Sequence, residues 1–157
     1  MEAKPIRVLF VCLANICRSP MAEALLRHKL TQAGLQERVV VDSAGVNLWR
    51  SGAPPHERTV AVLKSRGIDC THEARAFGKA DMDRFDYILA MDDDILRSIW
   101  AVGRSNARVF PVLKYAPGIG CDRVNDPIRT GRFDECYTVL DRACDGFLAA
   151  LRKQHEL

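Results

Sequence analysis

The stretch that most constrains the fold lies near the start of the chain, where an apolar run ends at a cysteine. Residues 6–11 are apolar except for Arg7, a pattern typical of a buried β-strand. Cys12 follows at once, and Arg18 comes six residues later. A strand, a short loop and an arginine in this order predict a loop that can enclose a small anion.

A helix is predicted to begin directly after this loop. Ser19 is a good N-cap, Pro20 suits the first helical position, and Glu23 would add an acid to the first turn. The loop would then lie over a helix N-terminus, where backbone N–H groups and the Arg18 fork can bind phosphate oxygens. The same positive field favours a thiolate at Cys12. Without its neighbours, Cys12 would read as a small buried hydrophobe.

Strand-like and helical patterns alternate along the rest of the chain. Helices are expected at about 19–33, 56–66, after Asp92 to about 102, and 133–153, with one turn at 79–84. Strands are expected at 6–11, 39–43, 85–91 and 107–112, followed by a long loop at 113–132. This order predicts a three-layer α/β fold, a four-stranded parallel sheet flanked by helices with the phosphate-binding loop after the first strand.

Composition restricts the class of protein. The 157 residues, 48% hydrophobic and 27% charged, are typical of one soluble domain spanning 1–157. A net charge of +3 is too weak to predict nucleic-acid binding, and no signal peptide or membrane-length apolar run is expected. Six unevenly spaced cysteines do not suggest a secreted disulfide framework. We expect reduced, mostly buried thiols at Cys70, Cys121, Cys136 and Cys144, and a cytoplasmic location.

Several motifs resemble those of the low-molecular-weight protein tyrosine phosphatases. Residues 12–20 resemble that family's signature, C-x-G-N-x-C-R-S-P, and the resemblance continues in the family's order over most of the chain. The further matching segments are 21–24, 42–45, His72, 85–92 and Asp126-Pro127. The resemblance implies a metal-independent enzyme, without a cofactor, that hydrolyses phosphotyrosine in proteins through a cysteinyl-phosphate intermediate.

The resemblance also implies roles for individual residues. Cys12 would be the nucleophile, Arg18 would bind phosphate, and Asp126 would act as general acid and then as base. An Asp-Pro turn of no catalytic importance is the alternative for Asp126. The phosphate-binding loop would comprise Leu13, Ala14, Asn15, Ile16, Cys17 and Arg18. Supporting residues around this loop would be Ser19, Ser43, His72 and Asp92.

Other positions depart from the family's pattern or stay ambiguous. Ala14 replaces the usual glycine, and would be strained by roughly 1 kcal/mol or more if that position has a positive φ. Cys17 either traps oxidised Cys12 as a disulfide or packs the loop. Trp49 either forms a wall of the substrate cleft or anchors a loop.

The residues after Pro127 are a further departure. Ile128 and Arg129 stand where aromatic residues are common in the family. We expect Ile128 at the substrate cleft, and Arg129 to favour an acidic residue beside the phosphotyrosine.

Two other activities use the same scaffold. Arsenate reductases of this type need further cysteines near a mobile segment, and none occurs at 79–102. Protein arginine phosphatases carry threonine where Ile16 stands. Asp92-Asp93-Asp94 is better explained as the start of a helix than as a metal site. Expected partners are phosphotyrosine proteins, among them a bacterial tyrosine kinase, with neither nucleic acid nor membrane, and the enzyme is expected to be a monomer or weak dimer.

Overall fold

The structure is a computed structural model that describes residues 4–47 and 49–157. Within these residues the chain forms one four-stranded parallel sheet with the order β2-β1-β3-β4, which confirms the predicted α/β class. The strands are β1 (Ile6–Cys12), β2 (Val39–Gly45), β3 (Tyr87–Ala90) and β4 (Arg108–Pro111). Because the strand order reverses beside β1, the carboxyl ends of β1 and β3 border the position where such sheets bind ligands.

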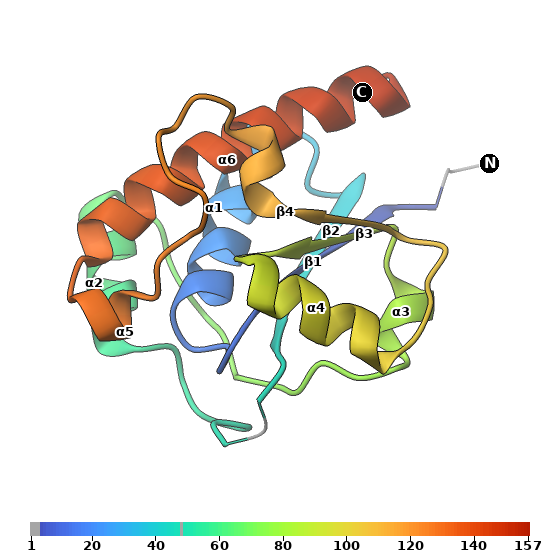
Figure 1. Cartoon of the computed structure of the whole chain (residues 1–157). Helices are drawn as coiled ribbons and strands as arrows, with labels where there is room; N and C mark the ends of the chain where they lie inside the picture. The colour runs from blue at the N-terminus through green and yellow to red at the C-terminus, as the bar shows by residue number, and fades with distance from the viewer. Residues whose placement is uncertain (1–3, 48) are drawn as a thin grey trace.

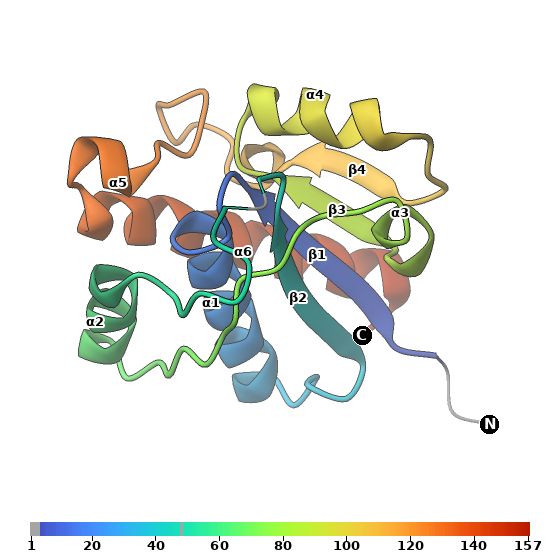
Figure 2. The same cartoon turned by 90° about the horizontal axis from the view of Figure 1, so that it is seen from below.

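Helices cover both faces of the sheet (Figures 1 and 2). α1 (Arg18–Gln32) and α6 (Phe133–His155) pack on each other on one face, whereas α4 (Asp93–Val102) and the short α3 (Asp81–Arg84) lie on the other. α2 (Glu57–Ser65) and α5 (Pro127–Thr130) lie toward the carboxyl ends of the strands. The three predicted layers are therefore present.

The alternating side chains of β1 explain the two cores. Val8 and Phe10 are fully buried against α1 and α6, and Leu9 and Val11 are fully buried in the second core beneath α4. A strand covered on both faces needs a continuous apolar run, which is what residues 8–11 provide.

The predicted loop after β4 contains two short helices that periodicity could not reveal. A 3₁₀ turn, η1 (Val112–Tyr115), precedes α5. α6 packs so closely on η1 that a Cβ atom at Gly146 would lie 1.8 Å from the carbonyl oxygen of Tyr115. Glycine at this helical position therefore permits a backbone contact that no other residue allows.

Candidate active site

The predicted catalytic residues meet at the carboxyl end of β1. Cys12 is the last residue of β1, and Arg18 is the first residue of α1. Both are almost fully buried, and together with Asp126 they line one small hollow. We call this the catalytic hollow; its walls are Cys12, Leu13, Ala14, Ile16, Cys17, Arg18, Asp126 and Ile128. The hollow thus brings together residues 12–18 and residues 126–128, which are more than a hundred positions apart in the sequence.

The loop bends at Asn15 and not at Ala14. Asn15 has a φ of 58°, and Ala14 is not among the described residues with positive φ. The condition for strain at Ala14 is therefore not met, because the left-handed conformation belongs to its neighbour. Asparagine tolerates this conformation better than most residues, and here its side chain is also fully buried and hydrogen-bonded.

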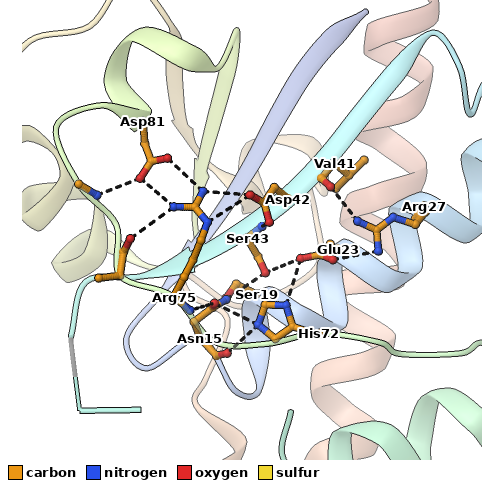
Figure 3. Close-up of polar contacts among 12 residues, drawn as sticks. Asn15, Ser19, Glu23, Arg27, Val41, Asp42, Ser43, His72, Arg75 and Asp81 are labelled. Carbon is orange, nitrogen blue, oxygen red and sulfur yellow. Dashed lines mark hydrogen bonds and ion pairs between the residues drawn. The ribbon is translucent and has the colours of Figure 1, made fainter. Parts of the chain in front are cut away.

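The Asn15 side chain ties the loop to three other segments (Figure 3). Its Nδ2 donates to Ser19 Oγ at 2.7 Å and to Ser43 Oγ at 2.9 Å. Its Oδ1 accepts the backbone N–H of Arg75 at 3.0 Å. That backbone donor fixes which end of the amide is oxygen, so the direction of the other bonds follows.

Ser19 does not cap α1 as predicted. The helix begins one residue earlier, at Arg18, and its N-cap residue Cys17 makes no side-chain capping bond. The Ser19 hydroxyl is fully buried and lies 2.9 Å from Cys12 Sγ, while it accepts from Asn15. A contact with Cys12 Sγ takes the place of the capping bond, and Pro20 accordingly lies inside the first turn.

Glu23 is a buried member of the site, and the prediction that it serves the first turn of α1 is wrong. Glu23 Oε1 accepts from Ser43 Oγ at 2.6 Å and lies 3.4 Å from His72 Nδ1. Burial acts to raise the pKa of Glu23, but hydrogen bonds from His72 and Ser43, with the charge of Arg27, outweigh burial and lower it. Glu23 is therefore an ionised carboxylate inside the protein.

His72 links this carboxylate to the loop. Its Nε2 lies 3.0 Å from both the backbone oxygen and Oδ1 of Asn15, which are acceptors, so Nε2 carries a proton. Its Nδ1 lies 3.4 Å from Oε1 of Glu23. His72 therefore joins Glu23 to Asn15, a structural role in keeping with the role predicted for it.

Arg75 is a residue that sequence reasoning missed. Its guanidinium contacts Asp42 at 3.0 Å and Asp81 at 3.0 Å (Figure 3). Asp42 lies on β2 and Asp81 opens α3, so Arg75 anchors the connector whose backbone supports Asn15. Asp42 is 33 residues away from Arg75 in the sequence, and only the fold brings these two residues together.

Arg18 is held from the side opposite Cys12. Its Nη1 donates to Asp92 Oδ2 at 2.8 Å and to the carbonyl oxygen of Val124 at 2.9 Å. Asp92 also caps α4 through Ile95, as predicted for the start of this helix. Burial acts to lower the pKa of Arg18, but the charge of Cys12 and the contact with Asp92 outweigh it and raise the pKa.

Asp126 lies at the start of α5. Its Oδ1 accepts the backbone N–H of Ile128 at 3.1 Å, so the carboxyl is oriented as an N-cap, and Pro127 occupies the first turn. Ile128 is half-exposed and lines the catalytic hollow. Trp49 is not among the hollow's lining residues and is 88% exposed, so its predicted place on the cleft wall has no support here.

Gly45, the last residue of β2, is required by the close approach of the catalytic loop. A Cβ atom there would lie 2.8 Å from Leu13 O and 2.9 Å from Asn15 N. Backbone bonds from Val46 to Cys12 and from Asn47 to Leu13 join the same segments. Only glycine lets β2 and the loop pack at this distance.

All six cysteines are free thiols. Burial raises the pKa of Cys17 and of Cys136 to about 12, so both are protonated packing groups in this state. Cys144 is fully buried, as expected, whereas Cys70 is partly exposed and Cys121 is exposed. The expectation that most are buried is thus wrong for Cys121, which lies on the loop before Asp126.

Two of the three acidic residues at 92–94 form ion pairs with arginines. Asp92 pairs with Arg18, and Asp94 contacts Arg97. Among residues 4–47 and 49–157, no group of three or more His, Cys, Asp and Glu side chains is arranged to hold a metal ion. No helix in the same part of the chain is long and apolar enough to cross a membrane.

Comparison with known proteins identifies close relatives. A family model described as "Low molecular weight phosphotyrosine protein phosphatase" matches residues 7–157. The low molecular weight protein-tyrosine-phosphatase YfkJ of Bacillus subtilis is 39% identical, over 97% of this chain and 99% of the relative. The low molecular weight phosphotyrosine protein phosphatase of Schizosaccharomyces pombe is 44% identical, over 94% of this chain and 98% of the relative.

Solved structures show the same architecture. The crystal structure of YfkJ from Bacillus subtilis matches with a TM-score of 0.94 at 38% identity, covering 98% of this chain and 99% of the other. The crystal structure of DARP, a Drosophila arginine phosphatase, matches with a TM-score of 0.88 at 32% identity, covering 94% of this chain and 98% of the other.

Proposed function

The chain belongs to the low molecular weight phosphotyrosine protein phosphatase family, and from this membership we propose that it hydrolyses phosphotyrosine in proteins through a cysteinyl-phosphate intermediate, without a metal ion. One observation carries the proposal: Cys12, Arg18 and Asp126 line the same hollow at the carboxyl end of β1. A nucleophile, an anion-binding fork and a carboxylic acid around a phosphate-sized space are the groups that phosphate ester cleavage needs.

In the first step, the Cys12 thiolate attacks the phosphorus atom opposite the tyrosine oxygen. The S–P bond forms while the P–O bond to tyrosine breaks, and protonated Asp126 transfers its proton to the leaving oxygen. The Arg18 fork and the loop N–H groups stabilise the charge on the three remaining phosphate oxygens. Arg18 is already held by Asp92 and Val124, so its orientation is fixed before the substrate binds.

In the second step, water attacks the phosphorus atom of the cysteinyl phosphate. The Asp126 carboxylate removes a proton from the water, the S–P bond breaks, and inorganic phosphate leaves with the thiolate restored. The Ser19 hydroxyl lies 2.9 Å from Cys12 Sγ, a distance suited to donating a hydrogen bond to the departing thiolate. Asn15, Ser43, His72 and Asp92 act as positioning residues for the loop and for Arg18.

Hydrolysis of p-nitrophenyl phosphate in the presence of excess chelator tests the proposal. Wild-type activity should persist, and Cys12→Ser should abolish it while retaining phosphate binding. Loss of wild-type activity on chelation would refute metal independence.

A second measurement tests the covalent intermediate. Acid quenching of wild type during turnover of a ³²P-labelled phosphotyrosine peptide should leave label on the protein, and Cys12→Ser should carry none. Steady turnover with no labelled protein at any quench time, in wild type or in the Asp126→Asn variant, would contradict the intermediate.

The arginine phosphatase among the similar structures makes phosphoarginine hydrolysis a second candidate. Ile16 lines the catalytic hollow where the resemblance places threonine in such enzymes, and this favours phosphotyrosine. Comparing kcat/KM on phosphotyrosine and phosphoarginine peptides decides between them. Arsenate reduction is a third alternative, and it would require arsenate-dependent oxidation of a thiol reductant by the wild type.

We further propose that the enzyme works in the cytoplasm as a monomer or weak dimer, on phosphotyrosine proteins that include a bacterial tyrosine kinase. Six free thiols support a reducing compartment. Sedimentation velocity under reducing conditions tests the oligomeric state.

A further inference from the structure

A second hollow of about 300 Å³ opens beside the catalytic hollow. Both are lined by Leu13, Arg18 and Asp126, so the second is a continuation of the reaction site. We call it the arginine hollow, after two residues on its walls, Arg123 and Arg129. A phosphotyrosine bound at Cys12 would bring its neighbouring residues to this space.

The carboxylates of the arginine hollow do not cancel the charge of its arginines. Asp92 forms its ion pair with Arg18 at 2.8 Å. Asp94 contacts Arg97, which does not line this hollow; both side chains of this pair are more than half exposed, so Asp94 keeps part of its charge. Asp126 must be protonated to act as the general acid, so it is uncharged when the substrate binds productively.

The two arginines are not neutralised in the same way. No carboxylate of the described residues lies at ion-pair distance from Arg129, and the nearest carboxylate to Arg123 is Asp122 at 3.5 Å. Both members of that contact are more than half exposed, and such pairs contribute little. The productive state of the hollow therefore has two available guanidinium groups, whose planar forks match a carboxylate.

The geometry of α5 fixes the backbone of Arg129 relative to Asp126. Ile128 N–H donates to Asp126 Oδ1, and Arg129 N–H donates to Asp126 O at 3.0 Å. Gly131, in the left-handed conformation, closes the turn with a bond to Pro127. Ile128 lines the catalytic hollow, and the next residue, Arg129, lines the arginine hollow.

We propose that the arginine hollow is a specificity subsite that binds an acidic side chain adjacent to the phosphotyrosine, with Arg129 and Arg123 as its ligands; this rests on the proposed phosphotyrosine phosphatase function. The preferred substrates are acidic phosphotyrosine segments of proteins. Because the guanidinium groups are exposed to solvent, the preference falls as ionic strength rises.

The test compares kcat/KM on matched phosphotyrosine peptides that carry Glu, Ala or Lys on the N-terminal side or on the C-terminal side of the phosphotyrosine. Wild type should favour Glu over Ala on at least one side, by about three- to fivefold at low salt. Arg129→Gln and Arg123→Gln should each reduce this preference. Arg129→Glu should favour the Lys peptide.

Two controls separate this effect from a damaged active site. Each peptide kcat/KM is divided by the same variant's kcat/KM on p-nitrophenyl phosphate, which has no flanking residues, so that any change in the chemical steps cancels from the peptide preference. Arg104→Gln removes an exposed arginine between α4 and β4, at the amino end of the parallel strands and so at the other end of the sheet from the hollow, and should leave the peptide preference unchanged.

The outcomes distinguish the subsite from the proposed function. Equal wild-type kcat/KM on Glu, Ala and Lys peptides overturns the subsite while leaving the phosphatase intact. A Glu preference that persists in the Arg129→Gln/Arg123→Gln double variant assigns it to other residues and also overturns the subsite. Failure of wild type on every phosphotyrosine peptide refutes the proposed function, and the subsite with it.

Discussion

The hydroxyl of Ser19 lies 2.9 Å from the sulfur of Cys12, and the side chain of Asn15 determines the direction of its proton. Since Asn15 Nδ2 donates to Ser19 Oγ, the hydroxyl hydrogen is available to Cys12 Sγ. Asn15 is in turn oriented by the backbone of Arg75. The donor to Cys12 Sγ is thus set by a chain of contacts that extends to the connector carrying Arg75.

Ser19→Ala should therefore slow the second chemical step more than the first. A thiolate without this donor is a stronger nucleophile but a poorer leaving group. We expect kcat to fall about 10- to 100-fold, with a larger burst of p-nitrophenol before the steady state, measured by stopped flow. Ser65→Ala, which changes an exposed hydroxyl on α2, is the control. An equal decrease in burst rate and steady-state rate would contradict the assignment.

Asp126→Asn should reduce activity according to the leaving group. We expect kcat to fall on the order of 10²- to 10⁴-fold on phosphotyrosine. The loss should be smaller on p-nitrophenyl phosphate, because p-nitrophenolate leaves without needing a proton as much as the tyrosine phenolate does. Asp122→Asn, an exposed carboxylate on the same loop, should behave as wild type. Equal losses on both substrates would exclude Asp126 as the general acid.

Glu23→Gln should remove part of the acid sensitivity of the fold. Since the pKa of Glu23 is lower in the folded protein than in the unfolded chain, its charge stabilises the fold above the unfolded value of about 4.3. That stabilisation is lost as pH falls through the lowered folded-state pKa. The variant should be less stable by about 2 kcal/mol or more at pH 7, with a smaller difference at pH 3.

Urea unfolding between pH 3 and pH 7 measures this change. Glu37→Gln, at an exposed position, serves as the matched control. Curves of unfolding free energy against pH that run parallel for wild type and Glu23→Gln would show that the Glu23–His72 pair does not contribute to the pH dependence.

Gly45→Ala should displace the catalytic loop. The added Cβ atom would meet backbone atoms of Leu13 and Asn15 at 2.8–2.9 Å, which cannot rotate away as a side chain could. We expect a loss of about 1–3 kcal/mol in unfolding free energy and weaker inhibition by inorganic phosphate. Gly78→Ala is the matched control, because nothing lies within 4 Å of its added Cβ atom. Equal effects of the two changes on phosphate inhibition would contradict a specific contact at Gly45.

The sequence predicted the layers of the fold because buried parallel strands leave continuous apolar runs, such as residues 8–11. It also predicted the segments that carry Cys12, Arg18 and Asp126, since the loop, the helix start and the Asp-Pro pair have short local signals. Such signals could not place the helix start at Arg18 exactly. They assigned Ser19 to the N-cap, whereas its hydroxyl contacts Cys12 Sγ.

The parts that were missed depend on partners distant in the chain. Arg75 pairs with Asp42, 33 residues away, and Glu23 with His72. A charged residue in a helix usually faces solvent, so the spacing of apolar residues in α1 gives no indication that Glu23 is buried. The left-handed residue could not be located from the sequence either: the glycine of the family signature raised the question at Ala14, whereas the positive φ occurs at Asn15.

Ala14 has a consequence for the unfolded chain. Its position in the catalytic loop does not require the left-handed conformation, so alanine fits there as well as glycine. An unfolded chain with alanine has fewer backbone conformations to lose than one with glycine, a difference worth about 0.4–1 kcal/mol at compatible sites. The loop proposed to bind phosphate therefore loses less backbone entropy on folding than the same loop with glycine at this position would.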